Sequence, residues 1–167
     1  IASKYKKQLL ECSIVFEEGT HTLDKILHAD LVIKSPGIPD KAPLIQELLN
    51  NGVSVISEIE WGYYFLEGGE VIAITGTNGK TTTATLTHHI LKSAHSNTLL
   101  AGNIGDSFAA AVAEQPTASY VLEVSSFQLD GIDQFRPHIS VLTNITPDHL
   151  DRYDYSFENY IGSKMRI

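Results

Sequence analysis

Short apolar runs alternate with stretches of helical periodicity along most of the chain. Strands are predicted over residues 31–33, 53–56, 71–75, 120–124 and 139–143. Helices are predicted over residues 42–50, 58–66, 79–94 and 108–113, with a last helix from about residue 156 onward. This alternation is typical of α/β folds with a mostly parallel sheet. No run of about 18 apolar residues occurs, so we predict no transmembrane helix.

Gly68-Gly69 is the strongest candidate for a domain boundary, because adjacent glycines interrupt helices and strands alike. We therefore predict one domain over residues 1–68 and a second over residues 69–167. The chain does not begin with Met, and we expect it to stop inside its last helix without a C-cap. Both domains are accordingly expected to be incomplete parts of a longer protein.

Charge and composition narrow the class of protein. The 12 Lys and Arg residues against 20 Asp and Glu give a net charge of −8, which argues against a broad nucleic-acid or membrane-surface interface. The single cysteine, Cys12, excludes an internal disulfide framework, and we expect it to be a small buried residue in a reducing compartment. No apolar stretch follows the N-terminal lysines, so no signal peptide is predicted and a cytoplasmic location is expected.

Residues 71–82, VIAITGTNGKTT, carry the strongest chemical signal in the sequence. They predict a strand, a glycine-containing turn and a helix start, where free backbone N–H groups and the helix dipole favour phosphate. Lys80 is expected to neutralise the β- and γ-phosphates, and the Thr81 hydroxyl to bind Mg²⁺. The full consensus has a glycine where Ile74 stands, so this is a variant P-loop, and an ordinary strand–helix turn is the alternative. The predicted nucleotide-binding residues are Gly76, Thr77, Asn78, Gly79, Lys80, Thr81 and Thr82.

Glu123 lies in the otherwise apolar run of residues 120–124, where an unpartnered carboxylate would cost several kcal/mol. Its partner is either a structural Arg or Lys or a metal ion. The place of Glu123 near the carboxyl end of a strand favours the metal. Ser125 and Ser126 follow directly, and they either cap the next helix or face a substrate.

His149 follows the last predicted strand, with Thr146 expected as an N-cap and Pro147 as the first residue of a short helix. A lone histidine is more often structural than a ligand. Here, however, the ends of three predicted strands bring Lys80, Glu123 and His149 to the same edge of the sheet. That convergence favours a phosphate and metal site.

Lys164 is predicted on the apolar face of the last helix. Phe157, Tyr160, Ile161 and Met165 form the apolar stripe of that face. Lys164 is either a lysine whose ammonium reaches solvent or an inward lysine with a lowered pKa, able to react as a neutral amine. The pattern alone slightly favours the first interpretation.

Together these motifs resemble those of the Mur ligase family, from about Leu31 to the end of the chain. The matching segments are Ser35-Pro36-Gly37-Ile38-Pro39, Ser57-Glu58-Ile59-Glu60, residues 75–82, Gly102-Asn103-Ile104-Gly105, residues 123–129 and residues 144–152. The P-loop and the Asp-His-Leu-Asp segment are shared across the family. The Ser-Ser-Phe-Gln-Leu and Ser-Pro-Gly-Ile-Pro segments resemble its D-glutamate-adding members.

The resemblance implies a fold and a reaction. The fold is a partial Rossmann-like N-terminal domain that binds a uridine nucleotide, followed by part of a P-loop NTPase-type central domain. The implied reaction is ATP-dependent and joins D-glutamate to UDP-N-acetylmuramoyl-L-alanine in peptidoglycan synthesis, through an acyl phosphate and with release of ADP. A monomer is implied as well.

The resemblance also implies roles for individual residues. It places Ser35, Pro36 and Gly37 at the nucleotide pyrophosphate, and Asn103 and Ser125 at the muramoyl-peptide end. The residues implied at two Mg²⁺ sites are Thr81, Glu123, His149 and Lys164. The implied catalytic residues are Lys80, His149 and Lys164. The family carries a carbamylated lysine at the position of Lys164, and carbamylation creates an oxygen ligand that suits Mg²⁺.

Two other classes remain as alternatives. A folate polyglutamate ligase usually has Gly and then Ser after the P-loop lysine, whereas this chain has Thr81-Thr82. A non-catalytic nucleotide-binding module would be expected to lack Glu123, His149 and Lys164. Part of the uridine pocket, the adenine contacts and the glutamate-binding C-terminal domain have no counterpart in this sequence. We therefore expect the chain by itself to be inactive.

Overall fold

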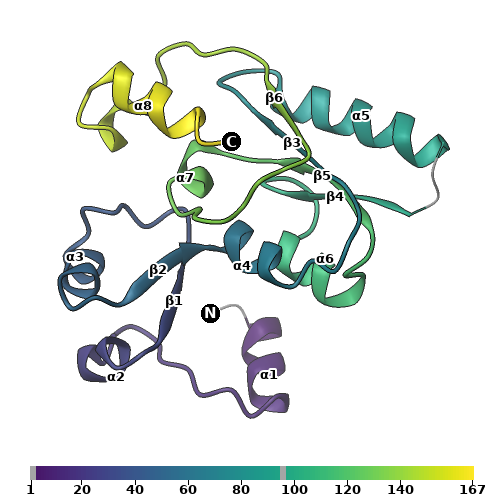
Figure 1. Ribbon diagram of the computed structural model, residues 1–167. Helices are drawn as coiled ribbons and strands as arrows, with labels where there is room; N and C mark the ends of the chain where they lie inside the picture. The colour runs from purple at the N-terminus through teal and green to yellow at the C-terminus, as the bar shows by residue number, and fades with distance from the viewer. Residues whose placement is uncertain (1–2, 95–96) are drawn as a thin grey trace.

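The computed structural model describes residues 3–94 and 97–167. The first part of the chain forms α1 (Ser3–Glu11), α2 (Leu23–Leu27), β1 (Leu31–Lys34), α3 (Pro43–Asn50), β2 (Ser54–Ser57) and α4 (Glu58–Tyr64) (Figure 1). The rest forms β3 (Val71–Thr75), α5 (Lys80–Ala94), β4 (Thr98–Gly102), α6 (Phe108–Glu114), β5 (Ser119–Glu123), α7 (Ser126–Leu129), β6 (Ile139–Leu142), the 3₁₀ helix η1 (Leu150–Arg152) and α8 (Phe157–Lys164). Within the described residues, no helix combines the length and apolar character needed to cross a bilayer.

The predicted α/β class with parallel sheets is confirmed. Strands β1 and β2 pair in parallel, and a second sheet has the order β4-β5-β3-β6 with parallel pairing between all neighbours. Helix α3, which connects β1 to β2, begins with Pro43, whose fixed φ suits a first helical turn. Its apolar side chains Ile45 and Leu48 are buried with Val53. The helix ends before Gly52, which has φ +74°.

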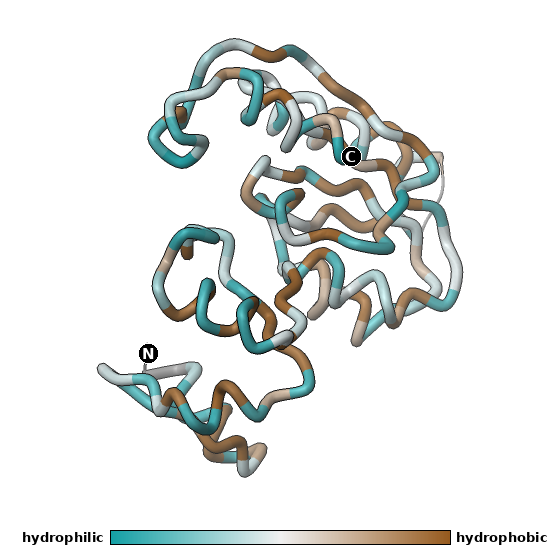
Figure 2. Tube along the Cα trace, turned by 60° about the vertical axis from the view of Figure 1, so that its left-hand side comes forward, coloured by the Kyte–Doolittle hydropathy of each residue, from teal (hydrophilic) through white to brown (hydrophobic). Residues whose placement is uncertain are grey.

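Strand β3 lies inside the four-stranded sheet, and its side chains alternate between two buried faces. Val71 and Ala73 join the core that includes α4 and α6, whereas Ile74 packs with Ala84 of α5 and with Val121. Figure 2 shows apolar positions gathered along these strands. Because helices cover both faces, the carboxyl edge of the sheet is the open place where polar groups gather.

Helix α4 lies before the predicted boundary at Gly68-Gly69 but packs on the second sheet. Ile59 is fully buried in the same core as Val71 and Phe108. Gly62 lies so close to α6 that a Cβ atom there would come within 2.8 Å of the Phe108 ring. These contacts favour a boundary at the junction of β2 and α4, and the division into residues 1–68 and 69–167 remains a prediction.

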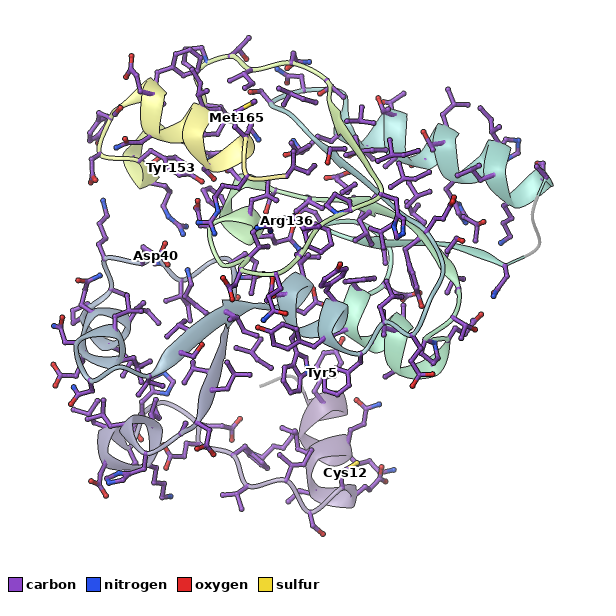
Figure 3. The ribbon with its side chains drawn as sticks, in the orientation of Figure 1. Tyr5, Cys12, Asp40, Arg136, Tyr153 and Met165 are labelled. Atoms are coloured by element: carbon purple, nitrogen blue, oxygen red, sulfur yellow. The ribbon has the colours of Figure 1, made fainter. Side chains whose placement is uncertain are left out.

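Three local expectations are wrong. Cys12 is exposed just beyond the end of α1, because residues 10–15 all lie exposed at the surface and form no core around it (Figure 3). Helix α8 ends at Lys164, before the end of the chain, and the Arg166 guanidinium beyond it donates to the carbonyls of Asp130 and Ile132. Met165 is 60% exposed and therefore does not belong to the apolar stripe of that helix.

Strand β4 was not predicted from the sequence. Its run of residues 98–102 is short, and only pairing with β5 defines it as a strand. The helix expected after Pro147 is also absent within the described residues, since η1 begins only at Leu150.

Candidate functional site

The P-loop connects the carboxyl end of β3 to the first turn of α5, as predicted. Gly76 and Gly79 have φ values of +144° and +83°, which residues with a Cβ rarely adopt. A Cβ on Gly76 would lie 2.0 Å from Thr143 Oγ1, so glycine is what lets the loop lie against the chain after β6. Helix α5 starts at Lys80, and its first N–H groups therefore point into the loop.

The segment after β6 holds the P-loop in shape. The Asn144 side chain accepts from Asn78 N at 3.0 Å and donates to Asn78 O at 2.9 Å. Thr77 N donates to Asn144 O at 2.9 Å, and the Thr77 hydroxyl donates to Thr146 O at 3.0 Å. The loop is thus preformed by neighbouring backbone and side chains, which reduces the entropy lost when a ligand binds.

Two lysines converge on one carbonyl of the P-loop. Lys80 Nζ donates to Gly76 O at 3.0 Å and to Thr77 O at 2.9 Å, while Lys164 Nζ donates to Gly76 O at 2.8 Å. Lys164 is 2% exposed, and its ammonium lies 4.8 Å from the centre of the Tyr160 ring. Burial, together with the nearby charge of Lys80, lowers the pKa of Lys164 to about 8. Of the two alternatives for Lys164, the structure therefore shows the inward lysine with a lowered pKa, and not the lysine whose ammonium reaches solvent.

Glu123 ends β5 next to the P-loop and is 2% exposed. Its Oε2 accepts from Thr81 Oγ1 at 2.7 Å, and its Oε1 accepts from Asn103 Nδ2 at 2.7 Å. The contacts described for Glu123 involve no Arg or Lys, so its partners are neutral donors. A buried carboxylate joined to a hydroxyl supplies the oxygen donor set that Mg²⁺ prefers.

His149 lies outside this contact group. It has the left-handed φ of +50°, its ring packs 5.3 Å from that of Phe127, and its Nε2 lies 3.6 Å from Asp148 Oδ2. Among residues 3–94 and 97–167, no cluster of three or more His, Cys, Asp or Glu side chains is arranged to hold a metal ion. Of the four predicted metal ligands, the structure joins Thr81 directly to Glu123 and places Lys164 against the same P-loop.

Ser125 caps α7, which is one of the two alternatives drawn from the sequence. Its Oγ accepts from Gln128 N at 3.3 Å, and Gln128 Oε1 accepts from Ser125 N at 2.9 Å, which completes a capping box. The helix so fixed carries Phe127, whose ring lies 4.4 Å from the Arg152 guanidinium.

Ser35, Pro36 and Gly37 form a turn at the carboxyl end of β1, closed by a 3.0 Å bond from Ile38 N to Ser35 O. A cleft of about 700 Å³ lies between the residues that follow this turn and the helices α7 and α8, and Asp40 and Tyr153 line it from opposite sides (Figure 3). Of the predicted substrate residues, Ser35, Pro36 and Gly37 thus lie across the cleft from α7 and α8, whereas Ser125 caps α7 and Asn103 bonds Glu123.

Sequence reasoning did not assign roles to Asn144 and Arg152. Both lie in the matched segment of residues 144–152, but an amide or a guanidinium gives no signal until its partner is known. Their partners are Asn78 for Asn144 and the turn at Pro36 for Arg152. Both pairs are far apart in the chain.

The comparisons with known proteins agree with this geometry. The family described as "Mur ligase middle domain" matches residues 74–167, more than half of the chain. The chain is 58% identical to the UDP-N-acetylmuramoylalanine--D-glutamate ligase of Christiangramia forsetii, 55% to that of Bacteroides fragilis and 49% to that of Porphyromonas gingivalis. Each alignment covers 100% of this chain and 37% of the relative. The chain therefore spans little more than a third of the length of these relatives.

Solved structures show the same fold. One is the UDP-N-acetylmuramate:L-alanyl-gamma-D-glutamyl-meso-diaminopimelate ligase from Neisseria meningitides, with a TM-score of 0.55 at 22% identity over 99% of this chain and 57% of that chain. Another is a UDP-N-acetylmuramoyl-L-alanyl-D-glutamate--2,6-diaminopimelate ligase, with a TM-score of 0.54 at 22% identity over 81% of this chain and 40% of that chain.

A parallel sheet with a P-loop at its carboxyl edge defines an α/β protein of the P-loop type. The match to residues 74–167 then fixes the family, and the chain belongs to the Mur ligases.

Proposed function

We propose that this chain is the part of an ADP-forming ligase that holds ATP and one side of the acceptor substrate. The reaction joins D-glutamate to UDP-N-acetylmuramoyl-L-alanine in peptidoglycan synthesis. The observation that carries the proposal is the meeting of Lys80, Lys164 and the Thr81–Glu123 pair around one P-loop. The names of the relatives that are 49–58% identical supply the substrates.

The P-loop suits the phosphates of ATP because it gathers positive charge without a broad basic surface. Helix α5 begins at Lys80, so the N–H groups of its first turn have no acceptor within the helix, and the helix dipole there favours anions. Lys80 Nζ donates to Gly76 O and Thr77 O. We propose that its ammonium turns from these carbonyls to the β- and γ-phosphates, with Asn78, Thr81 and Thr82 completing the site.

The residues present fit a divalent cation. Glu123 is a buried carboxylate whose described partners are Thr81 and Asn103, both neutral, so its negative charge has no local compensation in these contacts. We propose that Thr81 and Glu123 hold one Mg²⁺ and that His149 and Lys164 contribute to a second. When bound, Mg²⁺ offsets the negative charge that develops on the transferring phosphoryl group.

The chemistry is amide formation in two steps. An oxygen of the substrate carboxylate attacks the γ-phosphorus, the bond to the β-γ bridging oxygen breaks, and an acyl phosphate and ADP result. The amine of D-glutamate then attacks the acyl carbon, loses a proton and expels inorganic phosphate. Lys80 holds the transferring group in line for the first step, and the preformed P-loop keeps that geometry.

Lys164 is proposed to be carbamylated. A pKa of about 8 leaves about a tenth of this amine neutral at pH 7, and only the neutral amine can add to carbon dioxide. The product replaces a buried ammonium with an anionic oxygen group next to Lys80, whose positive charge would favour it.

The acceptor substrate is proposed to bind across the cleft. Its pyrophosphate would lie at Ser35, Pro36 and Gly37, and its peptide end near Asn103 and Ser125. The Ser125 hydroxyl is already used in the capping box, so its part in binding would be to fix α7. We further propose a cytoplasmic monomer that acts without membrane or nucleic acid.

The test is ADP release by the full-length protein with ATP, UDP-N-acetylmuramoyl-L-alanine and single amino acids. Release that depends on D-glutamate is expected. Equal release with another amino acid, or release without the nucleotide substrate, would refute the proposal. Residues 1–167 alone are expected to show no D-glutamate-dependent turnover.

A further inference from the structure

Arg152 connects the second sheet to the turn that ends β1. Its Nη2 donates to Pro36 O at 3.2 Å and its Nη1 donates to Gly37 O at 3.3 Å. The two carbonyls belong to consecutive residues. Arg152 lies 116 positions after Pro36 and 115 positions after Gly37 in the chain. One planar side chain therefore fixes two successive peptide groups of this turn.

The bond to Pro36 O determines where the next N–H points. In a trans peptide the carbonyl and the following N–H lie in one plane and point in opposite directions. Because Arg152 holds the Pro36 carbonyl toward itself, it turns the Gly37 N–H away from itself. Within the described residues, Gly37 N donates to no protein acceptor, and Gly37 is exposed. A free N–H in a fixed direction is a ready donor to an anion.

Arg152 is itself held in place. Its guanidinium lies 4.4 Å from the centre of the Phe127 ring, and Phe127 stacks on Tyr153 with 6.0 Å between centres and an interplanar angle of 14°. Phe127 belongs to α7, whose start is fixed by a capping box. Arg152 N also donates to His149 O at 3.0 Å, and this bond fixes the backbone from which the Arg152 side chain extends. The guanidinium therefore loses little freedom when it holds the turn.

We propose that Arg152 is a positioning residue for the uridine-nucleotide substrate, and that it acts by presenting the Gly37 N–H to the diphosphate. This inference rests on the proposed function. The diphosphate does not react, so Arg152 contributes equally to binding the ground state and the transition state. Its loss should raise KM for the nucleotide substrate while kcat and the KM for ATP stay unchanged.

Substitutions separate this role from a simple contribution of charge. Lysine keeps the positive charge but is a compact donor that lacks the planar fork needed to hold two carbonyls and stack on a ring. In the full-length protein, both Arg152→Lys and Arg152→Ala should raise KM for UDP-N-acetylmuramoyl-L-alanine about tenfold. Phe127→Leu should raise the same KM about threefold, and combined with Arg152→Ala it should add little.

Lys41 offers a matched control. Its Nζ donates to Asp151 O at 3.1 Å, so it connects the same two parts of the chain but does not hold the Pro36 and Gly37 carbonyls. Lys41 Nζ also lies 3.6 Å from Asp154 Oδ1, and both side chains are exposed. Because an exposed ion pair contributes little, Lys41→Ala should leave all three kinetic constants within about twofold of the wild-type values.

Steady-state ADP release with each substrate varied in turn gives the three constants. A wild-type KM for the nucleotide substrate in Arg152→Lys would overturn the proposal, since charge alone would then suffice. An equal rise of the KM in Lys41→Ala, or a parallel rise of the KM for ATP in the Arg152 variants, would also overturn it. Absence of D-glutamate-dependent ADP release in the wild type would contradict the proposed function instead.

Discussion

Glu60 joins the helix before the second sheet to the loop that leads into β6. It is fully buried, and its two carboxylate oxygens accept backbone N–H bonds from Asp133 at 2.8 Å, Gln134 at 2.8 Å and Phe135 at 2.9 Å. Oε2 takes two of the bonds and Oε1 takes one. The carboxylate on α4 thus satisfies three consecutive backbone donors of the loop before β6, of which the Phe135 N–H is buried and the other two are partly buried.

Glu60→Gln keeps the shape of this side chain but replaces one acceptor oxygen with an NH₂ donor. Whichever way the amide points, at least one backbone N–H then faces a donor. Each bond from an N–H to a charged group contributes about 1.5–3 kcal/mol, and an unsatisfied buried donor adds to the cost. We expect the free energy of unfolding to fall by about 3 kcal/mol.

Urea unfolding followed by the fluorescence of Trp61, the single tryptophan, measures this change, and circular dichroism checks that the variant folds. Glu58→Gln is the matched control, because Glu58 lies on the same helix and accepts from Ala109 N at 2.6 Å but is only half-buried. It should cost about 1 kcal/mol. An equal loss of stability in both variants would show that the three-bond arrangement at Glu60 is not what stabilises the loop.

Three further predictions concern the site. Lys80→Ala in the full-length protein should reduce ligation at least about a thousandfold, and ADP release close to the wild-type rate would contradict its phosphate role. Glu123→Gln should raise the Mg²⁺ concentration needed for half-maximal ADP release by about tenfold or more, and an unaltered Mg²⁺ dependence would rule out its metal role. In protein that carries Lys164 unmodified, the pKa of about 8 for this amine lies below that of the same lysine in the unfolded chain, so the unfolded state binds more protons between about pH 8 and 10. As the pH is raised from about 8 to about 10, the free energy of unfolding should therefore increase by up to about 3 kcal/mol. Lowering the pH back toward 8 should reverse this increase. Urea unfolding at each pH should show that Lys164→Met abolishes the rise, and an identical slope in that variant would refute the assignment.

Much of the fold could be predicted because its signals are local. The strands at residues 71–75 and 139–143 are apolar runs bounded by turn residues, and the P-loop glycines mark a backbone that few other residues adopt. A parallel sheet then brings the carboxyl ends of its strands to one edge. The meeting of Lys80 and Glu123 with the P-loop follows from that rule.

Other predictions failed where a local pattern had a competing tertiary partner. Thr146 and Pro147 indicate a helix start, but the Thr77 hydroxyl bonds both the N–H and the carbonyl of Thr146, and helical structure begins only at Leu150. Cys12 reads as a buried residue, yet nothing in a short sequence pattern shows how closely α1 packs on its neighbours.

By itself, then, the sequence determined the parallel α/β alternation, the P-loop and the convergence of a lysine and a carboxylate at one edge of a sheet. These features depend on residue spacing within about a dozen positions and on the geometry of parallel strands. Only the tertiary structure decided that Glu123 bonds Thr81 and Asn103, that Glu60 holds the loop before β6 and that Arg152 orients the turn at Gly37. Each of these depends on a partner 20 to 115 residues away, and the choice of such a partner is fixed by packing of the whole chain.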